Sequence, residues 1–300
     1  MLGLLRVMPC KTELNHRSIH LEFDGSGDVS FARAACQMNS SPHQFLGRFN
    51  NYARQDFHSE NMSRISSTPL LSPLYPKSPY HYIGSKLFLA LFNPTDKSLQ
   101  KLLPPELRPS DLKLAGLMFA KQPCKESGTF MESSVLVQCV FDNPETKQEE
   151  VGVYFPYAYA DTDVALASGR EMWGYPRKLA KISLNLRGDK LVATTVRGRN
   201  TLLKATCTLT DEGQWIDSGP NINIKMIPSV DGLGADVAAI TTAYLTYDVK
   251  KGRSGSAEIE ISSGPQDDLS TIEIENIMMG LYFDVDITVP QGKVVKKLSP

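Results

Sequence analysis

SGREMWGYPRKLAKI, residues 168–182, carries more reactive side chains than any other stretch of this chain. Arg177 and Lys178 stand close to the aromatic residues Trp173 and Tyr175 rather than among small polar residues. A cation among apolar neighbours experiences a low dielectric, where side-chain pKa values move furthest. The competing interpretation is structural, because cations after a helix interact with its last carbonyl groups and aromatic rings pack in cores. The stretch therefore predicts either a buried functional site or a structural helix end.

A lysine in such surroundings is a candidate nucleophile. Its ordinary pKa of ~10.4 keeps the amine protonated at neutral pH. A like charge about 5 Å away destabilises the ammonium form by roughly 3 kcal/mol at an effective dielectric near 20. Desolvation acts in the same direction, so Lys178 beside Arg177 could carry a neutral amine that attacks a carbonyl. The alternative is that Lys178 faces solvent, because adjacent residues of an extended chain point to opposite sides.

The flanks of this stretch indicate where it lies in the fold. Residues 161–174 have helical composition, with Asp161 or Asp163 as the expected N-cap. Pro176 prevents the helix from continuing. Residues 150–160, EVGVYFPYAYA, read as a buried strand just before the helix. The cations are therefore expected at the end of a helix that packs beside a strand.

The rest of the chain is rich in strands. About ten extended segments follow residue 112, with Gly, Asn and Asp between them, and residues 188–189 are expected at a tight hairpin turn. Residues 94–107 predict a short helix whose apolar face contains Leu99, Leu102 and Leu103. This pattern predicts an α+β fold of mainly antiparallel strands, a sandwich or a barrel with a few short helices.

The first 66 residues have a different texture. They contain scattered polar residues without a sustained hydrophobic period, so we expect a poorly ordered N-terminal extension over 1–66. Prolines at positions 69, 73, 76 and 79 then form an extended lead-in. A single folded domain is expected over 67–300.

Composition excludes several classes of function. The net charge of −1 argues against a nucleic-acid or anionic-membrane surface, and no apolar run approaches the roughly 18 residues of a membrane span. The five cysteines show no metal-ligand spacing, and all five histidines lie within the first 81 residues. We therefore expect no metal, no histidine-dependent hydrolysis in the main body, and a cytoplasmic protein with reduced thiols.

The stretch 168–182 resembles the signature of the acetoacetate decarboxylase family, which is roughly G-R-E-hydrophobic-aromatic-small-aromatic-P-K-K-L. Three other segments resemble this family in the same order along the chain: residues 71–107, the SGTFMESSVLVQ segment at 127–138, and IKMIPSVDG at 224–232. The resemblance extends over about residues 68–297. The chain also resembles decarboxylase-like proteins of fungal secondary metabolism, which have a similar proline-rich segment before the first strand.

This resemblance implies a cone-shaped antiparallel β-barrel around an apolar cavity, usually assembled into homo-oligomers. In the family, a lysine forms an imine (Schiff base) with the ketone of a β-keto acid. The iminium accepts the electrons when carbon dioxide leaves, and the resulting enamine is protonated and hydrolysed. The resemblance implies no metal and no organic cofactor.

The family's residues carry over unevenly. Glu132 falls on the family's cavity carboxylate, which helps to position substrate or move protons. Arg177 takes the place of the imine-forming lysine, and Lys178 that of its neighbour. An arginine cannot form the imine, because its guanidinium stays protonated and delocalised. Lys178 could replace it only through a shift or bulge after Pro176.

Other positions of the motif imply substrate contacts. Arg170 and Tyr175 match the family pattern, and Trp173 supplies an aromatic ring between them. The family's N-terminal arginine, which binds the substrate carboxylate, falls on Ser85, with Lys86 beside it. Lys121 is a further lysine on a predicted strand that could line the cavity.

The resemblance therefore predicts a carboxy-lyase that decarboxylates a β-keto acid, such as one derived from a polyketide, with Lys178, Glu132 and Arg177 as catalytic residues. Arg170, Tyr175, Trp173 and Lys86 are the expected substrate-binding residues. One alternative is a keto-acid enzyme on the same fold that performs aldol, dehydration or hydration chemistry, with Glu132 as acid or base. Another alternative is a barrel that binds a small acid without converting it.

Overall fold

The computed structural model describes residues 67–298 of the chain. Their strands form one continuous mixed sheet, which is 14-stranded and runs in the order β14-β11-β10-β5-β4-β3-β1-β13-β12-β9-β8-β7, with β2 paired to β4 and β6 to β5. The strands are β1 (Tyr80–Pro94), β2 (Arg108–Pro109), β3 (Ala115–Cys124), β4 (Gly128–Asn143), β5 (Gln148–Ala160), β6 (Arg177–Leu179), β7 (Lys181–Arg187), β8 (Lys190–Arg197), β9 (Asn200–Glu212), β10 (Asn221–Pro228), β11 (Ala235–Ala243), β12 (Thr246–Ile261), β13 (Ile274–Val289) and β14 (Lys293–Lys297).

The prediction of a mainly antiparallel α+β fold is confirmed, with two exceptions in strand direction. β5 pairs in parallel with both β10 and β6. A closed barrel is not confirmed: the sheet begins at β14 and ends at β7, and these two strands are not paired with each other. The sheet is strongly curved, but no hydrogen bonds join its two end strands, so it does not close into a barrel.

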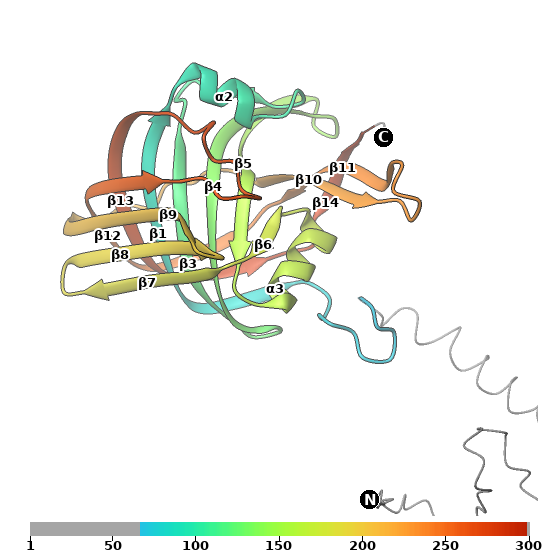
Figure 1. Cartoon of the computed structure of the whole chain (residues 1–300), viewed down its shortest axis with the longest axis horizontal. Coiled ribbons are helices and arrows are strands. Elements are labelled where there is room, and N and C mark those ends of the chain that lie inside the picture. Colours follow the sequence, from blue (N-terminus) through green and yellow to red (C-terminus); the bar gives the residue numbers. More distant parts are fainter. Residues whose placement is uncertain (1–66, 299–300) are drawn as a thin grey trace, which may run out of the picture. The chain divides into compact units, whose positions relative to one another are not determined.

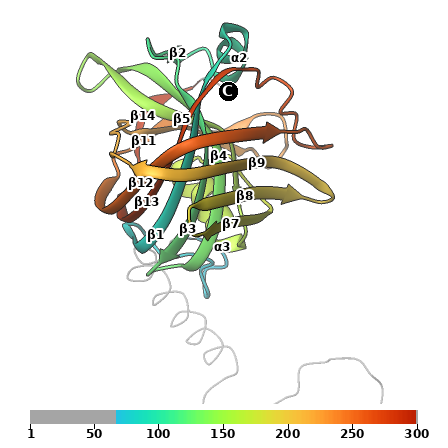
Figure 2. The same ribbon diagram turned by 90° about the vertical axis from the view of Figure 1, so that its left-hand side faces the viewer.

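The curled sheet makes two layers in its lower half. Strands β7, β8 and β9 run across β1, β3 and β4 at a steep angle, as both views show (Figures 1 and 2). One hydrophobic core lies between these layers, where Phe88 and Phe119 join Leu191 and Leu203. A second core lies on the opposite face of β1, β3 and β4, where it surrounds a cavity.

Strand alternation distributes residues between the two cores. On β4, Ser133, Val135 and Val137 are fully buried toward the layer interface. Their neighbours Glu132 and Ser134 line the cavity. Because successive side chains of a strand point to opposite faces, one strand serves both cores. The curvature that encloses the cavity comes with register shifts in β1, β12 and β13.

The first helix, α2 (Asp96–Leu102), matches the prediction. Thr95 caps it by accepting a hydrogen bond from the Ser98 N–H at 3.2 Å. Leu99 and Leu102 are buried on one face, and Leu103 is buried just after its end. The expected hairpin is also confirmed, because β7 and β8 pair around residues 188–189.

The second helical segment is α3 (Asp163–Ser168), followed by one π-helical turn, η1 (Gly169–Trp173). The expected cap was wrong, because Thr162 is the N-cap and accepts from the Ala165 N–H at 3.3 Å. Asp163 is already the first helical residue, and Asp161 instead accepts a hydrogen bond from the Met131 N–H of β4. The segment ends at Gly174, in the left-handed conformation with φ of 83°.

The extension predicted for 1–66 lies outside the described residues, so this domain boundary stays a prediction. Among residues 67–298, no helix is long and apolar enough to cross a membrane.

Candidate functional site

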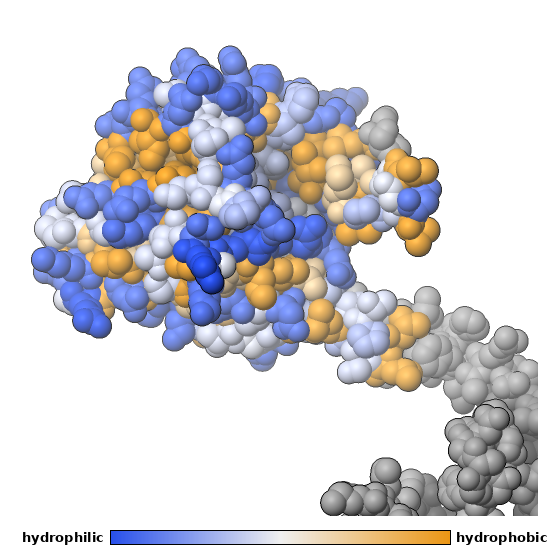
Figure 3. Space-filling model, viewed as in Figure 1, coloured by the Kyte–Doolittle hydropathy of each residue, from blue (hydrophilic) through white to orange (hydrophobic). Residues whose placement is uncertain are grey.

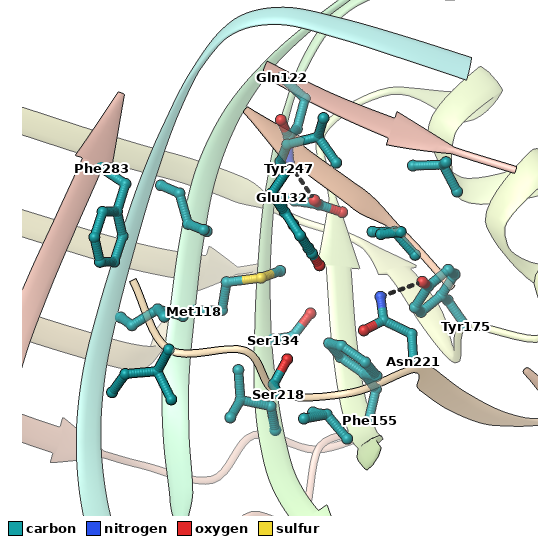
Figure 4. A pocket seen from close by; sticks show the side chains of 18 of the residues that line it. Met118, Gln122, Glu132, Ser134, Phe155, Tyr175, Ser218, Asn221, Tyr247 and Phe283 are labelled. Carbon is teal, nitrogen blue, oxygen red and sulfur yellow. Dashed lines mark hydrogen bonds between the residues drawn. The ribbon is translucent and has the colours of Figure 1, made fainter. Parts of the chain in front are cut away.

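A cavity lies on the inner face of β1, β3, β4 and β5, and β13 closes it on another side. The cavity has a volume of about 120 Å³. Most of the lining is aliphatic or aromatic, with polar side chains at a few positions (Figure 4). An apolar pocket with a few convergent polar groups is the usual form of a small-molecule site.

A buried ion pair lies at one end of this cavity. The Arg177 Nη2 group donates to Oε2 of Glu132, and both side chains are less than a tenth exposed. Gln122 holds the second carboxylate oxygen, since its Nε2 donates to Glu132 Oε1 at 2.8 Å. Both oxygens of Glu132 therefore have a donor, and the carboxylate is fixed in orientation.

The guanidinium of Arg177 is fixed on its other sides as well. Its Nη1 donates to the carbonyl oxygen of Ala165 in α3 at 2.8 Å. The rings of Phe130 and Tyr175 lie against it, with centroids 5.4 and 5.2 Å from its Cζ. A Cβ at Gly169 would come within 2.7 Å of the arginine side chain. Glycine at this position therefore leaves the space that Arg177 occupies.

Burial alone lowers the pKa of Arg177, but the charge of Glu132, followed by Tyr82 and Tyr175, outweighs burial and raises this pKa above its usual range. Arg177 is therefore a permanent cation. Desolvation raises the pKa of Tyr82 well above its usual value, and that of Tyr175 to about 12. Desolvation also raises the pKa of Tyr247. These three phenols are neutral hydrogen-bond donors at pH 7.

Backbone pairing explains why Arg177 points inward. β6 lies parallel to β5, with Arg177 opposite Ala158 and Lys178 opposite Tyr159. Arg177 is 6% exposed and lines the cavity, whereas Lys178 belongs to the other side of this short strand. No residue is inserted in the β6 pairing, so alternation keeps the two cations on opposite faces.

Lys178 contacts the segment before β13 instead. Its Nζ donates to Oδ1 of Asp267 at 2.9 Å and to the carbonyl oxygen of Gln266. Asp267 is 3% exposed and also accepts hydrogen bonds from Arg197 at 3.0 Å and from Tyr159 at 3.1 Å. Lys178 does not line the cavity, so the catalytic role predicted for it stays a prediction that this geometry does not support.

The other predicted residues divide in the same way. Trp173 and Tyr175 line the cavity beside Arg177. Arg170 is exposed and donates to the Arg177 carbonyl oxygen at 3.4 Å, outside the lining. Lys86 pairs with Asp284 at 2.9 Å across β1 and β13, again outside it. Lys121 is exposed, and Ser85 is fully buried but absent from the lining.

Several residues of the site were not predicted from the sequence. Gln122 lies diagonally across from Glu132, since β3 and β4 pair Ala120 with Glu132 and Gln122 with Phe130. Ser134 could have been predicted from the sequence, because the two-residue period of β4 places Phe130 and Ser134 on the same face as Glu132. Tyr247 and Asn221 carried no local signal, because distant strands bring them to the cavity.

No group of three or more His, Cys, Asp or Glu side chains between residues 67 and 298 is placed to hold a metal ion. The polar end of the cavity offers one carboxylate, which already pairs with Arg177. The described lining supplies the ion pair, amides and phenols to this end of the cavity.

Comparisons with known proteins point to one family. A family model described as acetoacetate decarboxylase (ADC) matches residues 67–298. The chain is 27% identical over 244 residues to acetoacetate decarboxylase 3 of Mesorhizobium japonicum, covering 78% of this chain and 91% of that protein. It is also 27% identical over 236 residues to the acetoacetate decarboxylase of Ralstonia nicotianae, covering 76% and 92%.

Solved structures show the same fold. The acetoacetate decarboxylase of Legionella pneumophila is 28% identical, with a TM-score of 0.67 and coverage of 75% of this chain and 90% of that one. Another acetoacetate decarboxylase structure has a TM-score of 0.71 at 24% identity, with coverage of 80% and 98%. The enduracididine biosynthesis enzyme MppR, complexed with pyruvate, has a TM-score of 0.68 at 16% identity, with coverage of 78% and 98%. At 24% and 16% identity, the likeness concerns the fold alone.

Proposed function

This chain belongs to the acetoacetate decarboxylase family, and from that premise we propose that it decarboxylates a β-keto acid in the cavity around Arg177 and Glu132, without a lysine imine. Its curated relatives named acetoacetate decarboxylase support carboxy-lyase activity on a keto acid. The observation that carries the proposal is the buried Arg177–Glu132 pair in a cavity whose described lining contains no lysine.

In the proposed reaction the substrate ketone oxygen lies at the Arg177 guanidinium. The bond between the α-carbon and the carboxylate breaks, carbon dioxide leaves, and the electron pair moves to the ketone oxygen as an enolate. Arg177 stabilises that developing negative charge in a site largely shielded from water. The α-carbon then takes up a proton from solvent water, and the resulting ketone is one carbon shorter. The ketone oxygen, rather than an iminium nitrogen, accepts the electron pair, and the permanent cation stabilises the resulting negative charge.

Glu132 and Gln122 act as positioning residues for Arg177 in this scheme. Their hydrogen bonds, with that of Ala165, hold the guanidinium plane in one orientation. The apolar lining favours departure of the carboxylate, because a charged group is less well solvated there than its neutral product. The same lining suits a chain longer than that of acetoacetate, and a polyketide-derived acid stays the expected class.

The experiment measures carbon dioxide release and covalent trapping together. Acetoacetate and β-ketooctanoate are incubated with the protein, borohydride is added, and peptides are mapped by mass spectrometry. We expect carbon dioxide release without a reduced adduct. Release should persist within about threefold in Lys178→Ala and fall at least 100-fold in Arg177→Gln, in line with the loss of one electrostatic catalytic group. An adduct on Lys178, or loss of release in Lys178→Ala at unchanged stability, would instead establish the imine mechanism.

A second candidate follows from the opposite orientation of the substrate. If the carboxylate rather than the ketone binds Arg177, its charge is stabilised and it does not leave. Glu132 would then lie near the substrate as a general base, which suits aldol, dehydration or hydration chemistry. Conversion of a keto acid without carbon dioxide release would identify this activity. Binding without conversion of either acid would indicate a non-catalytic binding protein.

The predicted homo-oligomer belongs to the same proposal. The β10–β11 hairpin projects from the sheet, and Val230 and Leu233 near its tip are 102% and 90% exposed. Figure 3 shows apolar atoms gathered at this end of the molecule. Exposed apolar side chains at such a tip are typical of contacts between protein copies.

A further inference from the structure

A second group of polar side chains lies in the cavity, away from the Arg177–Glu132 pair. Ser134 comes from β4, Ser218 from the loop between β9 and β10, and Asn221 from the start of β10. Figure 4 shows their polar atoms directed into the cavity space between Tyr247 and Phe155. Three separate elements therefore supply polar atoms to one apolar cavity.

These groups have unused hydrogen-bonding capacity. Among residues 67–298, neither the Ser134 hydroxyl nor the Ser218 hydroxyl has a hydrogen-bond partner within the protein, although Ser134 is only 3% exposed. Asn221 donates through Nδ2 to the Tyr175 hydroxyl at 2.7 Å, which leaves its Oδ1 as an acceptor. None of these three atoms is among the fully buried unpaired polar atoms of residues 67–298, so each is open to the cavity and free to bond a ligand there.

The spacing separates this group from the reacting end. Glu132 and Ser134 occupy the same face of β4 two residues apart, a distance of about 7 Å along the strand. A ligand whose ketone oxygen lies at Arg177 would reach Ser134 only with a later part of its chain. The apolar side chains of Met118 and Leu136 line the cavity around it and suit that chain.

We propose that Ser134, Ser218 and Asn221 form a second polar subsite, which binds a hydroxyl group on the chain of the keto acid. A hydroxyl fits better than a carbonyl, because it donates to Asn221 Oδ1 while it accepts from a serine hydroxyl. The substrate class is then a β-keto acid with an oxygenated chain rather than a plain alkyl chain. This inference rests on the proposed function for its reacting end, but the subsite itself makes no use of the reaction.

Binding can be measured without turnover. The chain has two tryptophans, Trp173 and Trp215, and both line the cavity. Their fluorescence therefore reports occupation of this cavity directly. The probes are octanoate and the monohydroxy octanoates that carry the hydroxyl at each successive chain position. None of them is a β-keto acid, so none can be decarboxylated during the binding measurement.

We expect one hydroxy isomer to bind about 3- to 10-fold more tightly than octanoate, the value of one or two net hydrogen bonds. Ser134→Ala and Ser218→Ala should each reduce that preference to within about twofold, leaving octanoate affinity unchanged. Ser133→Ala is the matched control, because Ser133 is the preceding residue of β4 but points to the other face, where it bonds Thr195 at 2.6 Å. The Ser133→Ala variant should prefer the hydroxy isomer over octanoate as strongly as the wild type does.

Two results would overturn the subsite. One is equal or weaker binding of every hydroxy isomer relative to octanoate, and the other is a preference that Ser134→Ala and Ser218→Ala both leave intact. Carbon dioxide release from β-ketooctanoate is measured separately. A preference for one hydroxy isomer without carbon dioxide release would support the subsite and contradict the proposed decarboxylation. Carbon dioxide release without such a preference would support the decarboxylation and contradict the subsite.

Discussion

At the scale of single residues, we expect the chemistry to depend on Arg177, which stands where the family resemblance implies a lysine. A lysine and an arginine bear the same charge, but only the amine can lose its proton and attack a carbonyl. Arg177 compensates with more donors, and the structure uses them on Glu132 and Ala165 while its plane lies against two aromatic rings. The cavity therefore has a fixed cation at position 177 and no amine there.

Arg177→Lys tests this exchange directly. The substituted side chain would place an amine in the cavity beside Glu132, where the family resemblance expects the imine. We predict a borohydride-trapped adduct with acetoacetate at position 177 of the variant and none at that position in the wild type. Lys178→Arg is the control, since it changes the neighbouring cation on the outer face. An adduct in Lys178→Arg but not in Arg177→Lys would contradict the assignment.

Gly169→Ala should disturb the site through Arg177. A Cβ at this position would lie 2.7 Å from the arginine Cδ and 2.8 Å from Nη1, so the guanidinium must move. We expect carbon dioxide release to fall about 10- to 100-fold, the usual cost of a misplaced catalytic group. Gly234→Ala, where the nearest atom is 4.0 Å away, is the control for the substitution itself. Equal activities in the two variants would show that Arg177 tolerates displacement.

At the scale of elements, the segment from α3 to β6 positions the site. Local pattern was enough to predict the helix and its end near Gly174. Alternation was considered for Arg177 and Lys178, but Lys178 was still predicted to be catalytic, and it does not line the cavity. It was not enough to predict the partner of Lys178, because Asp267 lies 89 residues away in the sequence. Local rules also failed to predict Thr162 as the N-cap, because the side chain of Asp161 accepts a hydrogen bond from the Met131 N–H of β4 instead of capping the helix.

The turn at Gly174 should be far less tolerant than another turn with similar backbone geometry. Both Gly174 and Gly188 have positive φ, at 83° and 61°. A Cβ at Gly174 would lie 2.7 Å from the Lys225 backbone, whereas Gly188 has nothing within 4 Å. We expect alanine to cost about 1 kcal/mol at Gly188 and about 3 kcal/mol at Gly174. Urea unfolding of the two variants measures the difference, and equal losses would rule out the close approach as its cause.

The loop around Asp267 should make stability depend on pH. Burial alone raises the pKa of Asp267, but hydrogen bonds from Lys178 and Tyr159 and the charge of Lys178 outweigh it, so the pKa is lowered from its ordinary 3.8. The ionised form therefore stabilises the fold above that value, and the contribution disappears as pH falls through the lower folded pKa. We predict that Asp267→Asn lowers the free energy of unfolding by about 3 kcal/mol at neutral pH.

That difference between Asp267→Asn and the wild type should shrink below pH 3.8. Urea unfolding at successive pH values measures it, with the exposed Asp111→Asn as the matched control. A difference that stays constant across this range would show that the charge of Asp267 contributes nothing.

At the scale of the whole molecule, the sequence predicted a β-rich domain with few helices, and the structure confirms it. Whether the sheet closes could not be predicted, because it depends on whether β14 and β7, at opposite ends of the strand order, meet. The cavity itself depends on β1, β4 and β13 curling together, a consequence of pairing between segments distant in sequence.

Self-association is expected at this scale through the β10–β11 hairpin. Replacing Val230 and Leu233 by Asp would place two charges on its exposed apolar tip. We expect a lower particle mass in sedimentation, while the unfolding temperature changes little because neither side chain packs in the core. A wild type that is monomeric at micromolar concentration would contradict the expectation at once.

The two faces of β4 have an evolutionary consequence. Glu132, Ser134 and Leu136 line the cavity, whereas Val135 and Val137 belong to the core between the layers. Substitutions on one face can change which molecules are accepted, and the contacts that keep the sheets together lie on the other. Descendants of one ancestor could therefore acquire different substrates by exchanging every second residue, while selection for folding acts mainly on the residues between them.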